Sequence, residues 1–348
     1  MIRQRVRSAT LRGYPELAQS LGLDATLMMR RAGLPRSCMD DPETPIDADA
    51  VRALLEATAQ ASGSEDIGLR LAGSRHLSNL GPLSLVLREE PTGLQALETL
   101  CRYLRLLNTS LLTRIDQEAE LVIIREEVLL AQPASARQSI ELAVGVMFRI
   151  LRDLLGPQWR ARRVCFAHRA PRSLGSHHAL FGPRVDFNQA FNGIVCDARD
   201  LLAQLPRTDP DMARYARQYL DRALGHQQAG HAHTVRQLVS ALLPGGRCTV
   251  DQVAQHLGVD RRTIHRRLLI EGETFSGVLR SVRREFALRQ FTDSDRPVAE
   301  VAELLGFSAP SAFAHWFKAE FGCKASEWRQ QQRARGQAGS SPSQARSR

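Results

Sequence analysis

A helix, a tight turn and a second helix occur twice between residues 249 and 321, and this repeat constrains the fold more than any other feature of the sequence. The first copy opens on an apolar helical face formed by Val250, Val253, Ala254 and Leu257. Gly258 ends that helix, and Asp260 is a good N-cap for the next. In that second helix Ile264 and Leu268 lie four residues apart, on one face. This is the outline of a helix-turn-helix unit.

The same roles recur further along the chain. Residues 298–305 form the apolar helix of the second copy, Gly306 forms the turn, and Ser308 is expected to cap a helix over residues 309–321. Ala254, Leu257 and Gly258 return 48 residues later as Ala302, Leu305 and Gly306, and Ile264 and Leu268 return 49 residues later as Phe313 and Phe317. A repeat with matched roles arises by chance far less often than a single match.

These residues carry a family resemblance. Together with residues 282–289, residues 301–308 and the later Phe321 and Gly322, the two copies resemble the AraC/XylS family of bacterial transcription regulators. The resemblance covers residues 233–332 and implies a seven-helix DNA-binding domain with two helix-turn-helix units. The alternative is a helical bundle that merely contains two tight turns. Exposed basic residues in the first unit favour DNA binding over that alternative.

The second helix of the first unit offers polar groups off its apolar stripe. Arg262, His265 and Arg266 share a face, and Arg261 stands at the start of the helix, where it can hold a phosphate. Arginine can bond guanine O6 and N7 together, and histidine can donate or accept at a base edge. The resemblance places the family's base-contacting positions on Arg262, His265 and Arg266, and in the second unit on Ser311 and His315.

The second unit is expected to read DNA less selectively. Pro310 stands where relatives often have a polar residue, and Lys318 is better placed for a phosphate than for a base. Between the units, residues 275–291 are predicted to form a helix about 25 Å long. Such a helix can space the two units so that both enter major-groove segments one turn apart.

Charge supports a polyanionic partner. The net charge of the chain is +10. Residues 234–348 hold 18 basic and 11 acidic side chains, so most of this excess lies in the third of the chain that carries the repeat. The sequence contains no run of about 18 apolar residues, and no apolar run follows the N-terminal arginines. We therefore expect a cytoplasmic protein with no membrane partner.

The first two thirds of the chain interleave helices with a few strands, which indicates a mixed α/β domain over residues 1–220. Capping boxes are predicted at residues 92–95 and 135–138. Strands are predicted over residues 111–115, 121–128, 163–168 and 193–196, and residues 171–183 are predicted to be a loop. Residues 221–232 are interpreted as a linker, residues 233–332 as the DNA-binding domain and residues 333–348 as a disordered tail.

The N-terminal part carries a second, more diffuse resemblance. Residues 67–71, 80–83, 164–168, 181–187 and 209–210 are similar to the regulatory domain of AraC relatives of the ornithine-utilisation-regulator type. In that group the domain dimerises and is thought to sense a small molecule. The resemblance implies a homodimer and an effector, but it does not carry a particular effector across.

The sequence offers little support for enzymatic or metal chemistry. The chain has none of the common nucleophile, dinucleotide, P-loop or zinc-protease motifs, so no catalytic residue is assigned and an enzyme is not expected. Six cysteines without a C-x-x-C pair are expected to be reduced thiols, and neither a metal nor a cofactor is assigned. One group could hold a metal only if its loop folded back: Cys165, His168, His177 and His178. A second group, His226, His231 and His233, has no carboxylate or thiol to support a metal. The adjacent pairs Glu89–Glu90 and Glu126–Glu127 are interpreted as solvated surface.

The sequence therefore predicts a transcription regulator that binds double-stranded DNA and works with RNA polymerase, and it leaves open whether the outcome is activation or repression. The N-terminal domain would sense a small molecule and dimerise. Two alternatives stay open: an N-terminal domain that only dimerises, and an enzyme with a DNA-binding appendage. A large, partly polar pocket in the N-terminal domain would favour sensing, whereas a filled core would favour dimerisation alone.

Overall fold

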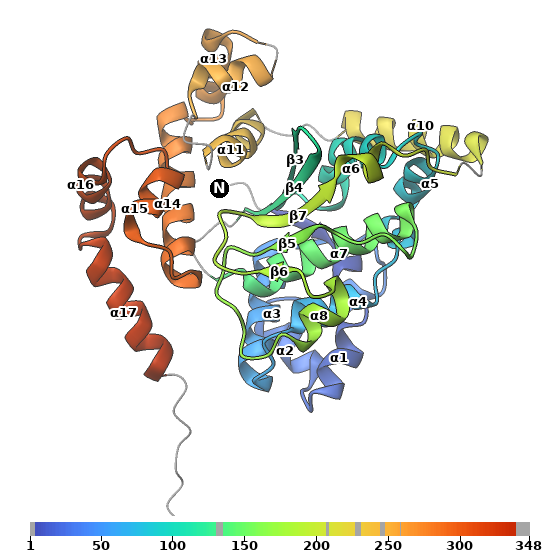
Figure 1. Cartoon of the computed structure of the whole chain (residues 1–348), viewed down its shortest axis with the longest axis horizontal. Coiled ribbons are helices and arrows are strands. Elements are labelled where there is room, and N and C mark those ends of the chain that lie inside the picture. Colours follow the sequence, from blue (N-terminus) through green and yellow to red (C-terminus); the bar gives the residue numbers. More distant parts are fainter. Residues whose placement is uncertain are drawn as a thin grey trace, which may run out of the picture. The chain divides into compact units, whose positions relative to one another are not determined.

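A computed structural model describes residues 4–129, 135–206, 209–226, 231–243, 248–257 and 259–338 (Figure 1). The chain separates into two compact units, residues 1–233 and residues 234–348. In the described residues the first unit combines helices with two sheets, and the second contains helices and no strand. This is the expected mixed α/β unit followed by an all-α unit.

The first unit begins with a small helical layer. Strand β1 (Arg5–Arg7) pairs antiparallel with β2 (Pro45–Asp47). Between and after these strands lie η1 (Ser8–Leu11), α1 (Tyr14–Ser20), α2 (Ala25–Arg31), η2 (Arg36–Met39), α3 (Ala48–Ser62) and α4 (Ile67–Gly73). Asp47 caps α3, because its side chain accepts from the backbone N–H groups of Asp49 and Ala50. The inward side chains of α1 to α4 form one hydrophobic core.

A five-stranded sheet follows, with the strand order β3-β4-β7-β5-β6. Its strands are β3 (Leu111–Glu118), β4 (Leu121–Val128), β5 (Arg163–Cys165), β6 (Val185–Asp186) and β7 (Asn192–Asp197). Only β5 and β6 pair in parallel. Strand β3 is three residues longer than predicted, because the chain reverses in the two residues 119 and 120, and Ala119 adopts a left-handed φ of 48°.

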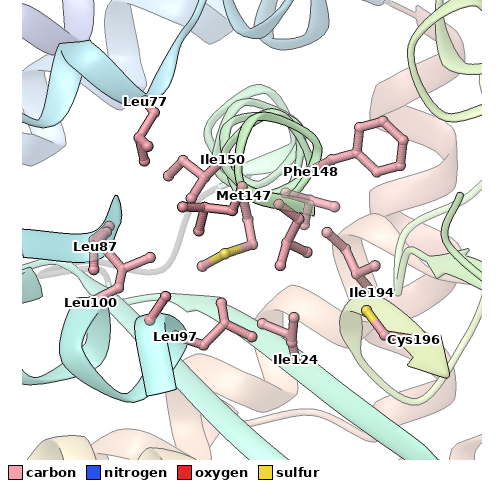
Figure 2. Packing of buried hydrophobic residues seen from close by; sticks show 14 of the residues in the cluster. Leu77, Leu87, Leu97, Leu100, Ile124, Met147, Phe148, Ile150, Ile194 and Cys196 are labelled. Atoms are coloured by element: carbon pink, nitrogen blue, oxygen red, sulfur yellow. The ribbon is translucent and has the colours of Figure 1, made fainter. Parts of the chain in front are cut away.

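Helix α7 (Arg137–Leu155) is the centre of the larger core and packs on α3, α4 and strands β4 and β7 (Figure 2). Met147, Phe148 and Ile150 lie among side chains from η3 (Leu77–Leu80), α5 (Pro82–Arg88), α6 (Gly93–Leu107) and the sheet. Burying each such side chain stabilises the fold by about 1.5–3 kcal/mol. The core is therefore built across elements that are distant in the sequence.

Three further helices complete this unit: α8 (Gly175–Phe181), α9 (Ala198–Leu202) and α10 (Pro210–His226). Helix α8 lies in the segment that the sequence suggested to be a loop, so that prediction is wrong. Its residues are weak helix formers, but two of them are held by tertiary contacts. Ser176 bonds the carboxylate of Asp66, and His177 contacts Glu141.

Helices α11 to α17 make up the second unit. Their bounds are α11 (His231–Leu242), α12 (Val250–His256), α13 (Arg261–Ile270), α14 (Phe275–Asp293), α15 (Val298–Leu304), α16 (Pro310–Phe321) and α17 (Ala325–Ala338). Helices α10 and α11 include residues that the sequence suggested to be linker, and residues 227–230 between them lie outside the described part. Helix α17 likewise continues six residues into the segment expected to be a disordered tail.

Two predicted caps are wrong. The N-cap of α16 is Ala309 and not Ser308, because Pro310 starts the helix with a fixed φ and no N–H to satisfy. The capping box at residues 135–138 does not form, since the N-cap of α7 is Ala136. The side chain of Gln138 instead reaches the start of α4. It accepts from Gly68 N at 3.0 Å and donates to the carbonyl of Glu65, two residues before the helix, at 3.1 Å.

Candidate nucleic-acid interface

The first helix-turn-helix unit is formed by α12 and α13, and both helices are capped by side chains. Thr249 and Gln252 form a capping box at the start of α12, with two reciprocal bonds of 3.2 Å. Asp260 Oδ1 accepts from Thr263 N at 2.6 Å at the start of α13. Backbone hydrogen bonds from that first turn lower the pKa of Asp260 below its ordinary value. These caps fix where α13 begins.

The turns of the two units share one backbone geometry. Val259 N donates to Ala254 O at 3.0 Å in the first unit, and Phe307 N donates to Ala302 O at 3.0 Å in the second. Gly306 takes a φ of 74° in the second turn, and the corresponding Gly258 lies outside the described residues. The spacing of 48 residues seen in the sequence thus appears again as a pair of equivalent hydrogen bonds.

Helix α13 presents its polar residues to solvent and its apolar stripe to the core. Ile264 and Leu268 are buried, whereas all four of the residues singled out in the first unit are exposed: Arg261, Arg262, His265 and Arg266. None of the four makes an ion pair among the described residues. An unpaired basic row on one exposed helix is a surface to which a polyanion can bind.

Helix α16 is arranged in the same way, with a different surface. Phe313 and Phe317 are buried, while Ser311, His315 and Lys318 are exposed. The buried rings join a cluster of aromatic side chains that also includes Phe291, Phe307, Trp316, Phe321 and Trp328. The exposed face therefore carries one cation and one imidazole, where α13 carries three guanidinium groups and one imidazole.

Helix α14 lies between the two helix-turn-helix units as a spacer, and one of its faces is buried. At about 1.5 Å per residue its 19 residues span about 28 Å. Arg283 Nε donates to Leu305 O at 3.0 Å, which ties α14 to the end of α15, and its guanidinium lies 4.8 Å from the centre of the Phe307 ring. On the other side, Arg236 of α11 pairs with the buried Glu285 of α14. These contacts hold the spacer against elements on both sides.

The histidine cluster of the N-terminal unit gathers around the buried carboxylate of Glu141. His177 Nε2 and His168 Nε2 lie 3.2 and 3.4 Å from Glu141 Oε1, and Arg137 Nε lies 3.2 Å from the same oxygen. Burial lowers the pKa of His168 to about 4, so this ring is neutral at pH 7. Among the described residues no three His, Cys, Asp or Glu side chains are placed to hold a metal ion. The side chains of His226, His231 and His233 lie outside the described part.

Two glutamates predicted to be solvated are buried instead. Glu126 lies on the core face of β4, because side chains alternate along a strand and residues 122, 124 and 128 of the same strand face inward. Its carboxylate accepts from Thr113 Oγ1 at 3.1 and 3.2 Å. Glu90 is buried too, and it pairs with Arg217 at 2.5 Å. The alternation in residues 121–128 was the sign that could have revealed Glu126.

The N-terminal unit contains a pocket with a cavity volume of about 160 Å³. Its walls come from β1, α3, α6, β4 and α7, together with the segment around η3. Most of the lining is aliphatic, and its charged members are Arg7, Arg75 and Glu126. The pocket is therefore small and partly polar, with a mainly aliphatic lining.

The comparisons with known proteins agree with this architecture. A family model described as the arabinose-binding domain of AraC transcription regulator matches residues 22–205, and one described as a helix-turn-helix domain matches residues 253–331. The HTH-type transcriptional regulator VirS of Mycobacterium tuberculosis is 28% identical over 326 residues, which cover 93% of this chain and 96% of that protein. The ornithine utilization regulator of Pseudomonas aeruginosa is 24% identical and covers 90% of this chain and 93% of its own length.

A solved structure also aligns along most of the chain. The transcriptional regulator CdpR from Pseudomonas aeruginosa covers 90% of this chain and 97% of its own, with 20% identity and a TM-score of 0.42.

Two helix-turn-helix units with exposed polar helices, joined to a unit of mixed helices and sheet, define a DNA-binding transcription regulator. The family models together match well over half of the chain, and the first alone matches more than half. The chain belongs to the AraC family of transcription regulators, and its N-terminal unit is of the arabinose-binding type. No helix in the described part is long and apolar enough to cross a membrane.

Proposed function

We propose that this protein is a one-component transcription regulator in which α13 and α16 read an operator and a small molecule bound to the N-terminal unit controls the outcome. The observation that supports operator reading is the exposed basic face of α13, whose cations make no ion pair among the described residues. The second helix-turn-helix unit has a matching turn geometry. Mapping of bound sites across a genome tests it. A protein with no preferred sites would contradict the proposal.

The DNA contacts are assigned by the reach and chemistry of each exposed side chain. Arg262, His265 and Arg266 read base edges in the first half-site. In the second half-site Ser311 and His315 read bases. Arg261 and Lys318 bind phosphates, which fix the position of the protein but carry no sequence information.

The phosphate role of Arg261 has a distinct signature in salt. Each neutralised phosphate contributes about 0.9 to the slope of log affinity against log salt concentration. We expect Arg261→Ala to weaken binding to all sequences alike and to lower that slope by about 0.9. Fluorescence anisotropy over a salt series, with operator and random duplexes, measures both. An unchanged slope with an altered base preference would mean that Arg261 reads a base.

Effector control is supported by the cavity in the N-terminal unit. A domain that served dimerisation alone would have no need of a pocket lined by a buried arginine and a buried glutamic acid, which are costly to retain. We assign residues 1–220 to sensing and dimerisation, residues 221–232 to the linker and residues 233–332 to DNA binding. RNA polymerase is the expected protein partner, the cytoplasm is the expected compartment, and activation is the expected outcome.

A homodimer is supported by helix α10. Met212, Tyr215 and Tyr219 lie at i, i+3 and i+7 on one face, and their exposed fractions are 49%, 62% and 63%. Large apolar side chains exposed together on one helix mark an interaction surface. A second copy of the chain can cover this row with its own α10, as a two-fold interface requires.

The double substitution Tyr215→Ser and Tyr219→Ser is expected to weaken dimerisation at least about a hundredfold, because each buried ring contributes about 1.5–3 kcal/mol. Sedimentation equilibrium of the full chain measures this. Leu202→Ser, which removes an exposed apolar side chain from α9, is the control and should leave the dimer intact. A double variant that stays dimeric would place the interface elsewhere.

A further inference from the structure

The cavity in the N-terminal unit has mostly aliphatic walls, and its neutral polar members are Thr10, Asn79, Asn108, Ser110 and Ser139. Leucine, valine, isoleucine, alanine and methionine side chains make up most of its lining, and none of the described residues that line it is aromatic. A polyhydroxylated ligand such as a sugar needs a polar partner for each hydroxyl, and an unpaired hydroxyl in such a space costs about 1–3 kcal/mol. These walls suit an aliphatic chain better than a sugar or a stacked ring.

Arg75 is a buried cation without a carboxylate partner in the described part of the chain. Its side chain lines the cavity, the residue is only 5% exposed, and one guanidinium nitrogen donates to Thr10 O at 2.6 Å. Burial lowers the pKa of Arg75 to about 10, which still leaves it charged at pH 7. Arg7, also in the lining, is different, because it pairs with Glu43 at 2.6 Å and donates to Asn79 O at 3.0 Å. A buried, unpaired charge is costly, so Arg75 is the group that an anion would stabilise.

Glu126 does not neutralise the cavity at pH 7. The residue is 2% exposed, and its carboxyl contacts the hydroxyl of Thr113 and no cation in the described part. Burial raises its pKa to about 8, so the protonated form dominates at neutral pH. The cavity therefore holds one uncompensated positive charge and one neutral acid that can donate a hydrogen bond.

The volume limits the length of the ligand. A cavity of about 150 Å³ in an engineered protein core holds benzene, and the cavity here has about 160 Å³. A ligand of roughly six to eight non-hydrogen atoms fits that space. An aliphatic acid of this size puts its carboxylate on Arg75 and its hydrocarbon chain against the leucine side chains.

We propose that the effector of this regulator is a short aliphatic carboxylate, bound in the cavity of the first unit with its carboxylate on the Arg75 guanidinium and its chain along α6 and α7. This inference rests on the proposed effector control and names its chemical class. Glu126 faces the same space as a neutral hydrogen-bond donor. The lining also holds Arg7, which pairs with Glu43. Arg75, with a pKa of about 10, and Cys101 on α6, with a pKa raised to about 12 by burial, keep their dominant charge state between pH 7 and 9.

Calorimetric titration of the intact protein with hexanoate, hexylamine, hexanol and L-arabinose tests the proposal. Hexanoate is expected to bind best. Arg75→Gln should weaken hexanoate binding at least tenfold, since a charge-assisted bond contributes about 1.5–3 kcal/mol. Arg88→Gln, a matched change of an exposed arginine on α5, should have no effect. Stronger binding of hexylamine or arabinose than of hexanoate would overturn the proposal.

Two further variants test the proposal even if Arg75→Gln destabilises the fold. Ala143→Leu adds bulk in the cavity wall without touching the arginine, and it should abolish hexanoate binding. The parent should lose affinity for hexanoate above about pH 8, where Glu126 ionises and repels the ligand. Glu126→Gln should remove this dependence on pH. An affinity that is independent of pH in the parent would contradict the placement of Glu126.

The ligand class and the proposed effector control can fail separately. If hexanoate does not bind but Ala143→Leu alters transcription from a mapped promoter, the carboxylate is wrong and effector control stands. If Ala143→Leu regulates that promoter like the parent in every growth condition, effector control through this cavity fails.

Discussion

Alanine in place of Gly68 is expected to destabilise the N-terminal unit by about 3 kcal/mol or more, at or beyond the upper end of the usual range for an overpacked core. A Cβ at this position would lie 2.1 Å from Gln138 O and 2.9 Å from Leu142 N. Both atoms belong to the backbone of α7, so no side chain can move aside. The hydrogen bond from Gly68 N to Gln138 Oε1 would be lost as the helices separate.

Gly73 provides the matched control, since it lies on the same helix and a Cβ there would meet no atom within 4 Å. Gly73→Ala should leave stability unchanged or raise it by up to about 1 kcal/mol, because alanine restricts the unfolded chain. Urea unfolding of both variants, followed by circular dichroism, measures the difference. Equal stability of the two variants would show that α4 and α7 are not packed this closely.

Sequence discrimination is expected to be concentrated in the half-site under the first helix-turn-helix unit. The loss of one bidentate contact costs about 1–3 kcal/mol in discrimination, so Arg266→Ala should flatten the preference at its base pair roughly tenfold or more. His315→Ala should cost less, because only His315 on α16 combines reach with directed bonding, and serine pairs with several bases.

Selection of bound sequences from a random pool, with each variant beside the parent, measures this asymmetry. The parent should yield one well-defined half-site and one degenerate half-site. Equally strong base preferences in both half-sites would contradict this hypothesis. So would a larger loss of sequence preference from His315→Ala than from Arg266→Ala. Lys318→Ala is a useful companion, because a phosphate contact should lower affinity without changing the selected sequence.

The parts of the fold that could be predicted are those in which local spacing fixes which side of a helix is buried. Ile264, Leu268, Phe313 and Phe317 were recognisable as core residues because a helix places residues four apart on one face. Asp260 was recognisable as a cap for the same local reason. The failure at Ser308 is also local, because Pro310 two residues later moved the start of the helix.

The cavity could not be predicted, because its chemistry depends on residues that only the tertiary fold brings together. Arg75 and Glu126 are 51 positions apart in the sequence and lie on different elements. Nothing in the neighbourhood of Arg75 shows that it is buried. Helix α8 was missed for a related reason, since contacts of Ser176 and His177 with distant carboxylates outweigh the weak helix propensity of its residues.

The length of α14 has a consequence for the promoters that such a regulator controls. A helix held on both sides cannot stretch, and one inserted base pair would rotate one half-site by about 35° around the duplex relative to the other. Point mutations in an operator would then be tolerated to differing degrees, whereas a single insertion or deletion between its halves would abolish recognition. Operators that descend from one ancestor should accordingly change in base sequence and keep the spacing between their half-sites. A search for target genes should therefore require a fixed spacing before it requires a strict consensus sequence.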